Sequence, residues 1–199
     1  MTILKPAVEL DRNKMSQMTP AERIRYEIDA ILAHRPDLAA ANAQVAAVMA
    51  GPTSTLPRRL TELVRLRIAF FNQCRTCMSL RYAPAEVSEG LVCSLERPQE
   101  SADLSDGEKI AIKFAELMAT DHLAIDAGLF DELRRHYSEA QIVELCVACA
   151  LHVGFGRMGA TWQMYEHLPE RFQQEQDAPF TPWGGEGIAS APRNSTRSI

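Results

Sequence analysis

The amino-acid sequence predicts an all-α fold, on three observations. Capping boxes occur three times; they mark helix starts because a Ser or Thr side chain, and an acidic or amide side chain three positions later, satisfy free amides of the first turn. Between these signals, apolar residues recur at three- and four-residue spacing, which is the period of one helix face. No stretch longer than four residues alternates apolar and polar positions as a half-buried strand would.

The start and stop signals divide the chain into successive helices. The capping boxes pair Thr19 with Glu22, Ser105 with Glu108 and Ser138 with Gln141. Together with proline and glycine breakers, they predict helices at about 19–34, 37–50, 57–71, 74–82, 105–120, 128–137, 138–153 and 160–167. A short helical piece ending near residue 95 and a loop over 96–103 lie between them. The pair Gly154 and Gly156 is expected to bend the chain before the last helix.

The same signals predict three regions. Residues 1–18 form a short N-terminal arm, and residues 19–172 form a compact helical domain. From residue 173 the chain is polar and rich in proline and glycine, so 173–199 is expected to be an extended or disordered, irregular tail. Phe180 and Trp183 are the large anchors of this tail, and pack either on a neighbouring subunit or on their own domain.

Composition excludes several classes of function. Hydrophobic residues make up 46% and charged residues 24%, a balance that fills a globular core. A net charge of −5 and a pI near 5.6 argue against a nucleic-acid partner, because phosphates require a basic surface. No stretch appears long and apolar enough to cross a bilayer, and no signal-peptide core precedes the first helix, so no membrane partner and a cytoplasmic location are predicted.

The five cysteines include a pair, Cys74 and Cys77, at CxxC spacing before a predicted helix. Free amides and the helix dipole stabilise a thiolate there, and the spacing lets the second sulfur close a disulfide. Arg75 and Arg81 add positive charge nearby. We interpret the pair as redox-active. The alternatives are two buried small side chains, or a zinc site, which is disfavoured because structural zinc normally requires four ligands.

A second CxxC, Cys146 and Cys149, is followed by His152 inside an apolar helical stretch. Residues at this spacing spread over about a third of a helix circumference, and free cysteine is among the most buried residue types. Core packing is therefore the preferred interpretation, and a zinc ion shared with the first pair is the alternative. His152 is interpreted as a core histidine or as a replacement acid near the site. Cys93 is interpreted as inert.

The segment around the first CxxC resembles the carboxymuconolactone decarboxylase/alkylhydroperoxidase D-like superfamily. The resemblance lies in Glu62, eleven intervening residues, Cys74, two more residues and Cys77, within a Leu-x-Glu-Leu-Val-x-Leu-Arg-Ile-Ala helix. It extends more weakly over about 20–170, through the helix after Ser105 and the stretch 142–145.

This resemblance implies a compact helical bundle that assembles as a homo-oligomer: a dimer, trimer or hexamer. It also implies that Cys77 attacks a hydroperoxide, that Cys74 resolves the product, and that Glu62 belongs to a proton relay. The expected partners are a hydroperoxide or other small-molecule substrate and a thiol reductant. No cofactor and no metal are expected.

Arg81 stands where the family motif has its relay histidine. Arginine stays protonated and cannot act as a general base. If the helices on either side of the CxxC form an antiparallel hairpin, Glu62 and Arg81 lie at similar positions along its axis. An ion pair between them is then expected. The guanidinium would then lie one turn beyond Cys77 and lower the pKa of its thiol. The proton for the leaving oxygen would come from Tyr82, Glu62 or water.

Three functions follow from these observations. The first is a thiol-dependent peroxidase or disulfide oxidoreductase that uses Cys77, Cys74, Glu62 and Arg81. The second is decarboxylation or hydrolysis of a small lactone acid, which needs a general acid or base but no dithiol. The third is a non-catalytic, redox-sensitive oligomer.

Overall fold

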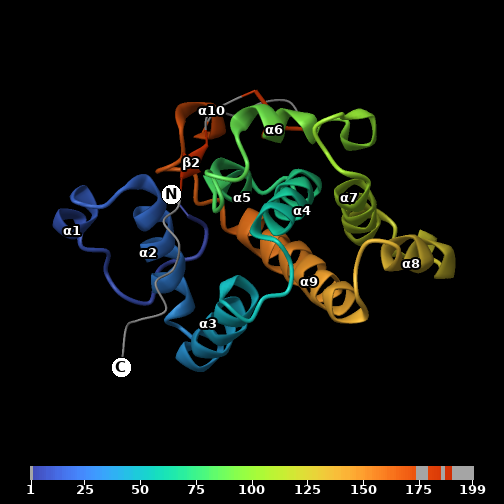
Figure 1. The fold of residues 1–199 in the computed structure, drawn as a ribbon. Helices are drawn as coiled ribbons and strands as arrows, with labels where there is room; N and C mark the ends of the chain where they lie inside the picture. The colour runs from blue at the N-terminus through green and yellow to red at the C-terminus, as the bar shows by residue number, and fades with distance from the viewer. Residues whose placement is uncertain (1, 174–178, 185–186, 190–199) are drawn as a thin grey trace.

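The computed structural model describes residues 2–173, 179–184 and 187–189, and it is almost entirely helical (Figure 1). The helices are α1 (Arg12–Ser16), α2 (Pro20–Leu32), α3 (Pro36–Ala50), α4 (Arg58–Phe71), α5 (Arg75–Ser79), α6 (Glu89–Ser94), α7 (Asp106–Thr120), α8 (Ala127–Arg134), α9 (Glu139–Trp162) and α10 (Glu170–Gln173). Two short 3₁₀ turns lie at Pro98–Glu100 and His122–Ala124. The all-α prediction is confirmed.

Helix α4 lies at the centre of the bundle, and α7 and α9 pack against it (Figure 1). Its apolar residues fill the main core; Leu63, Val64, Leu66 and Ile68 have no exposed surface. Helices α7 and α9 contribute residues such as Phe114 to the same cluster. Burying these side chains is the main stabilising term, about 1.5–3 kcal/mol for each large apolar residue.

The three capping boxes begin helices where the sequence predicts them. Thr19, Ser105 and Ser138 are the N-caps of α2, α7 and α9, and each box is complete in both directions. These contacts satisfy amides that have no partner inside the helix. The N-terminal arm also contains a helix, α1, which is capped by Asp11.

The predicted helix over 74–82 ends earlier than expected. Helix α5 stops at Ser79, and β1 (Leu80–Arg81) pairs in parallel with β2 (Ile188–Ala189) from the C-terminal segment. The prediction of a helix to residue 82 is therefore wrong, because backbone groups after Ser79 bond to a segment more than 100 positions away.

The glycines in the long C-terminal helix do not interrupt it. Helix α9 runs unbroken from Glu139 to Trp162 and ends where Gln163 adopts a left-handed conformation, so the prediction of a separate helix over 160–167 is wrong. Gly156 has a packing role instead: a Cβ there would lie 2.3 Å from the Asn72 side-chain nitrogen. Its absence lets the end of α4 approach α9.

By length and mean hydropathy, 1.4 over 18 residues, α9 is also the one helix in the described part of the chain that could cross a membrane. The prediction that no stretch meets this criterion is wrong. A single such helix is weak evidence for a membrane span, because the core helix of a bundle passes the same test. Ile142, Leu145 and Cys149 of α9 are indeed buried in the main core.

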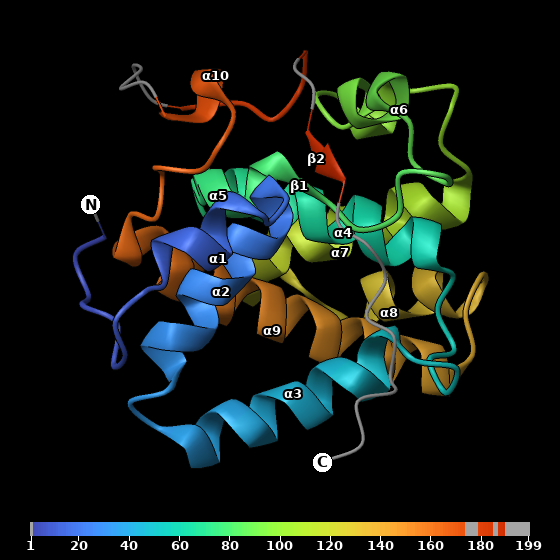
Figure 2. The same ribbon diagram turned by 90° about the vertical axis from the view of Figure 1, so that its left-hand side faces the viewer.

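The described part of the C-terminal tail is packed on its own domain. Phe180 is 4% exposed and Trp183 is 9% exposed. Phe180 joins a second core cluster with Met78 and Phe172, and Trp183 packs on Phe70 at a ring-centroid distance of 4.9 Å. Figure 2 shows this segment crossing over α5 and β1, between α10 and α6. The other residues of the tail predicted to be extended or disordered lie outside the described residues.

Candidate active site

The turn between α4 and α5 places the two cysteines. Helix α4 ends at Phe71, and Gln73 reverses the chain with a φ of 50°, in the left-handed region that non-glycine residues seldom adopt. Cys74 is then the N-cap of α5, and the Cys77 amide donates a hydrogen bond to its sulfur over 3.2 Å. The sequence therefore places a cysteine sulfur where a capping oxygen usually lies.

Cys74 and Cys77 form a disulfide across the first turn of α5, with their Cα atoms 5.2 Å apart. The two sulfurs differ in environment: Cys74 is fully buried, whereas Cys77 is half-buried. Cys77 is therefore the more accessible partner. The order of attack and resolution expected from the sequence stays a prediction.

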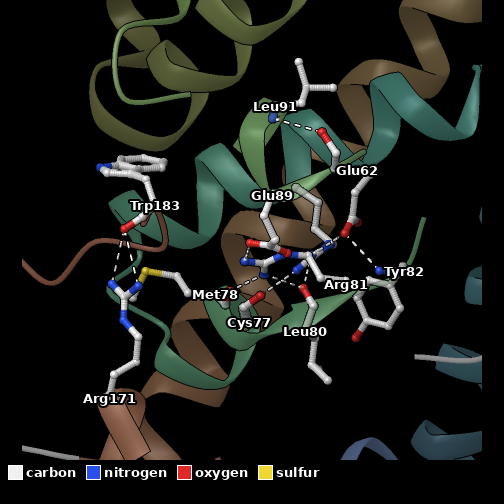
Figure 3. Close-up of polar contacts among 12 residues, drawn as sticks. Glu62, Cys77, Met78, Leu80, Arg81, Tyr82, Glu89, Leu91, Arg171 and Trp183 are labelled. Atoms are coloured by element: carbon white, nitrogen blue, oxygen red, sulfur yellow. Dashed lines mark hydrogen bonds and ion pairs between the residues drawn. The ribbon is translucent and has the colours of Figure 1, made fainter. Parts of the chain in front are cut away.

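Two arginines, Arg65 and Arg81, hold the opposite end of α5; Figure 3 shows Arg81 beside Met78 and Leu80. Arg65 donates to the carbonyl oxygens of Cys77 and Leu80, both over 2.7 Å. Arg81 donates to the carbonyl oxygens of Met78 and Leu80, over 2.6 and 3.1 Å. A helix end normally leaves such carbonyls without partners, and a cation there also complements the helix dipole. The two guanidinium groups thus fix the short helix that carries the disulfide.

Glu62 binds Arg65 through both carboxylate oxygens, over 2.7 and 2.9 Å, and also accepts a hydrogen bond from the Tyr82 amide. Burial opposes ionisation of Glu62, but the charge and hydrogen bonds of Arg65 outweigh it and lower the pKa of this carboxyl. Glu62 is therefore held as a carboxylate that positions Arg65. Its part in a proton relay stays a prediction.

The expected ion pair between Glu62 and Arg81 is wrong. Arg81 pairs with Glu89 of α6 instead, over 2.7 and 3.0 Å (Figure 3). Glu62 is occupied by Arg65. The physical reason is that the chain after Ser79 continues as β1 rather than as helix, which turns the Arg81 side chain toward α6. Arg81 is 2% exposed, so it is a buried structural cation at this position.

Sequence reasoning missed three residues of this arrangement: Arg65, Glu89 and Gln73. Arg65 follows Glu62 by three positions on a helix, a spacing that brings opposite charges together, and this signal could have identified the pair. Glu89 is in another helix, and the role of Gln73 depends on the C-terminal segment. Neither leaves a local signal.

The second CxxC lies in the core, as the packing interpretation expects. Cys149 is buried, and burial raises the pKa of its thiol. Cys146, Cys149 and Cys93 are free thiols. Across the described residues, no three His, Cys, Asp or Glu side chains are grouped so that they could hold a metal ion.

His152 lies on the face of α9 that meets the end of α4, and its carbonyl accepts a hydrogen bond from the Asn72 side chain over 2.8 Å. Burial lowers the pKa of His152 to about 4, and the positive charge of Arg65 acts in the same direction. The imidazole is therefore neutral at physiological pH. A neutral imidazole is the form expected of a core histidine.

Comparisons with known proteins were made for the sequence and for the fold. No protein-family model matches the chain. A 90-residue stretch is 38% identical to an uncharacterized protein of Mycobacterium tuberculosis strain CDC 1551/Oshkosh and to one of strain ATCC 25618/H37Rv. This stretch covers 43% of the chain but only 31% of each of those proteins.

The fold has a solved counterpart. The crystal structure of an alkylhydroperoxidase AhpD core, an uncharacterized peroxidase-related protein from Ralstonia eutropha JMP134, superposes with a TM-score of 0.63 and 17% sequence identity. The match covers 85% of this chain and 94% of that one. The chain therefore has the alkylhydroperoxidase D-like fold, as its CxxC segment predicts.

Proposed function

We propose that the protein is a thiol-dependent peroxidase that reduces hydroperoxides with Cys77 and Cys74. The observation that carries this proposal is the Cys74–Cys77 disulfide at the start of α5, in which Cys77 is the accessible partner. The peroxidase-related protein with the same fold supports it. Oxidoreductase activity of this kind needs no metal or cofactor.

The chemistry follows from the positions of the two sulfurs. In the reduced protein, the Cys77 thiolate attacks one oxygen of the hydroperoxide; the O–O bond breaks, an alcohol leaves and Cys77 becomes a sulfenic acid. The Cys74 thiol then attacks the Cys77 sulfur, which releases water and forms the disulfide. Two equivalents of a thiol reductant restore both thiols.

The proton for the departing oxygen comes from water in this proposal. Glu62 is held ionised by Arg65, and Arg81 is a permanent cation bonded to backbone carbonyls, so neither carries a proton suited to donation. Tyr82 is 43% exposed and its ring lies 4.6 Å from the Arg65 guanidinium, so it can hold such a water at the edge of the site.

The test is oxidation of the reduced protein by one equivalent of an organic hydroperoxide or hydrogen peroxide. We expect a loss of two hydrogens, which peptide mass mapping places at Cys74 and Cys77, and one equivalent of alcohol from the organic hydroperoxide. Cys74→Ser should instead retain a sulfenic acid on Cys77, and Cys77→Ser should not react. Cys93→Ser, which removes a free thiol outside the pair, should behave like the parent protein. Survival of both thiols would show that the pair has only a structural role.

A further inference from the structure

The C-terminal segment is bound at both ends of helix α5. We define the strap as its described residues, 179–184 and 187–189. At the start of α5, the Gln73 side chain accepts a hydrogen bond from the Phe180 amide over 2.8 Å and donates one to the Phe180 carbonyl over 3.2 Å. This pair of bonds resembles one rung of a β-ladder. The residue directly before Cys74 therefore clasps the strap.

At the far end of α5, the strap closes over Arg81. Gly187 lies so near that a Cβ there would be 2.5 Å from the Arg81 guanidinium carbon. The next two residues pair with β1, Ile188 opposite Leu80 and Ala189 opposite Arg81. Only glycine permits this approach, so this position is fitted to the buried arginine.

Between these ends, the strap is held from a third direction. Arg171 of α10 donates to the Thr181 carbonyl over 2.8 Å. It also donates to the Trp183 carbonyl over 3.3 Å (Figure 3). Two of its own side chains, Phe180 and Trp183, are buried in two different core clusters. The strap is thus a packed part of the molecule and not a surface loop.

The half-buried partner of the disulfide, Cys77, lies in the same apolar surroundings as the strap. Cys77 packs against the second core cluster, to which Phe180 belongs and against which Ile188 also packs. Cys74 is fully buried, so a reagent reaches the disulfide through Cys77, whose apolar surroundings include these two strap residues.

We propose that the strap is a gate over the Cys74–Cys77 disulfide, and that Gln73 and Gly187 are the positioning residues that hold it closed. Thiols and hydroperoxides then react with Cys77 at a rate limited by the fraction of molecules in which the strap is released. This proposal rests on the proposed function only because both concern reactions of the Cys74 and Cys77 sulfurs. The gate itself applies to any thiol–disulfide exchange.

The experiment uses full-length protein and dithiothreitol, a small dithiol. Dithiothreitol transfers two hydrogens to the disulfide and leaves as its cyclic disulfide, so the reaction needs no peroxidase activity. Gly187→Ala pushes the strap from Arg81, and its matched control is Gly154→Ala, where no atom lies within 4 Å of the new Cβ. Gln73→Gly removes the clasp, and its control is Gln163→Gly, at the other left-handed glutamine, which is exposed.

We expect Gly187→Ala and Gln73→Gly to speed reduction on the order of tenfold, the scale expected from losing one or two hydrogen bonds of the closed state. The two control variants should react like the parent protein. Reoxidation by cyclic dithiothreitol should accelerate by the same factor, because a gate changes both rates and leaves the equilibrium constant unchanged. Arg171→Gln releases the strap from α10, at a distance from α5, and should act in the same direction if either first variant fails to fold.

Two results would overturn the gate. One is reduction at the parental rate in every folded strap variant. The other is faster reduction with a matching shift of the equilibrium constant, which would mean that the substitutions alter the disulfide itself. A protein that is inert to hydroperoxides but shows accelerated exchange in both directions would retain the gate and refute only the peroxidase proposal.

Discussion

Arg81 shows how one residue can change the proton chemistry that is available at a position. Its guanidinium is almost completely buried, donates to two carbonyls at the end of α5 and pairs with Glu89. A histidine at this position could exchange a proton near neutral pH, whereas arginine cannot. The position therefore provides a constant positive charge and a fixed helix end.

We expect Arg81→Met, which keeps most of the side-chain volume but removes the donors, to lower the free energy of unfolding by about 2–4 kcal/mol. The loss arises because the Met78 carbonyl loses its side-chain donor and Glu89 loses its ion-pair partner, whereas the Leu80 carbonyl keeps its hydrogen bond from Arg65. Urea denaturation measures it. Arg97→Met is the control, since Arg97 is 72% exposed in its ion pair and should contribute less than about 0.5 kcal/mol. Equal effects of the two substitutions would contradict this role.

His152 predicts a pH dependence of stability. Burial lowers the pKa of His152 to about 4 from an ordinary value of 6.5. Between these values the unfolded chain binds a proton that the folded chain does not, so stability falls as the pH falls through this window, by about 3 kcal/mol in total. Above the unfolded-state pKa, the imidazole is neutral in both the folded and the unfolded chain, so this loss of stability is absent.

His152→Gln should remove this part of the pH dependence, measured as the free energy of unfolding at intervals from pH 4 to 7. His122→Gln, at an exposed histidine, should leave the slope of the parent protein unchanged. If the slope survives in His152→Gln, other groups titrate in this window and the histidine is not the cause.

At the scale of elements, the contact between α4 and α9 depends on Gly156. The Asn72 side chain, at the end of α4, occupies the space that a Cβ would need and donates to the His152 carbonyl. Asn72 also accepts a hydrogen bond from Arg157 over 3.2 Å. This cluster lies directly before the turn that carries Cys74, so it helps to place the disulfide.

Gly156→Ala and Gly154→Ala should have opposite effects on stability. The first forces Asn72 away and should cost about 1–3 kcal/mol, as overpacking does. The second faces open space in a helix and should stabilise by about 0.5–1 kcal/mol. Chemical denaturation of both variants checks the pair, and a destabilised Gly154→Ala would show that the helix needs flexibility there.

Helix α5 illustrates how little a short element specifies for itself. Five residues are too few to form a stable isolated helix. Its start is fixed by the Cys74 cap, and its end by Arg65 and Arg81. The geometry of the cysteine pair is therefore imposed by α4, α6 and the C-terminal segment.

At the scale of the whole molecule, several apolar side chains remain on the surface. Helix α3 has no buried residue, and Leu38, Val45 and Val48 on it are 41–59% exposed. On α9, Val143 is 61% exposed and Val147 is 42% exposed. Apolar helix faces of this kind are usually covered in the functional state. We propose that a second copy of the chain covers them, as expected for a homo-oligomer.

The double substitution Val143→Glu with Val147→Glu places two charges on that face of α9. It should shift the native mass, measured by light scattering, from an oligomer to a monomer, because burying the carboxylates in an interface is unfavourable. Thr161→Glu, at an exposed polar position of the same helix, is the control and should leave the mass unchanged. A monomeric parent protein would refute the proposal.

Much of the fold was predictable because its signals are local. Capping boxes and apolar periodicity join residues three or four positions apart, and they correctly predicted the starts of α2, α7 and α9 and the core face of α4. The CxxC spacing likewise predicted the disulfide, since the cysteines share one helical turn. Alone among the site's ion pairs, Glu62 with Arg65 also had a local spacing, yet it was missed in favour of a longer-range partner.

The remaining features depended on contacts between distant parts of the chain. The end of α5, the pairing of Arg81 with Glu89 and the clasp of Gln73 on Phe180, 107 positions away, arise only when the bundle has formed. Such contacts depend on the distance and orientation of whole helices, which no local pattern encodes. The amino-acid sequence alone therefore determined which residues could do redox chemistry and on which kind of element they lie. The packed bundle decided which charges hold those residues and which segment covers them.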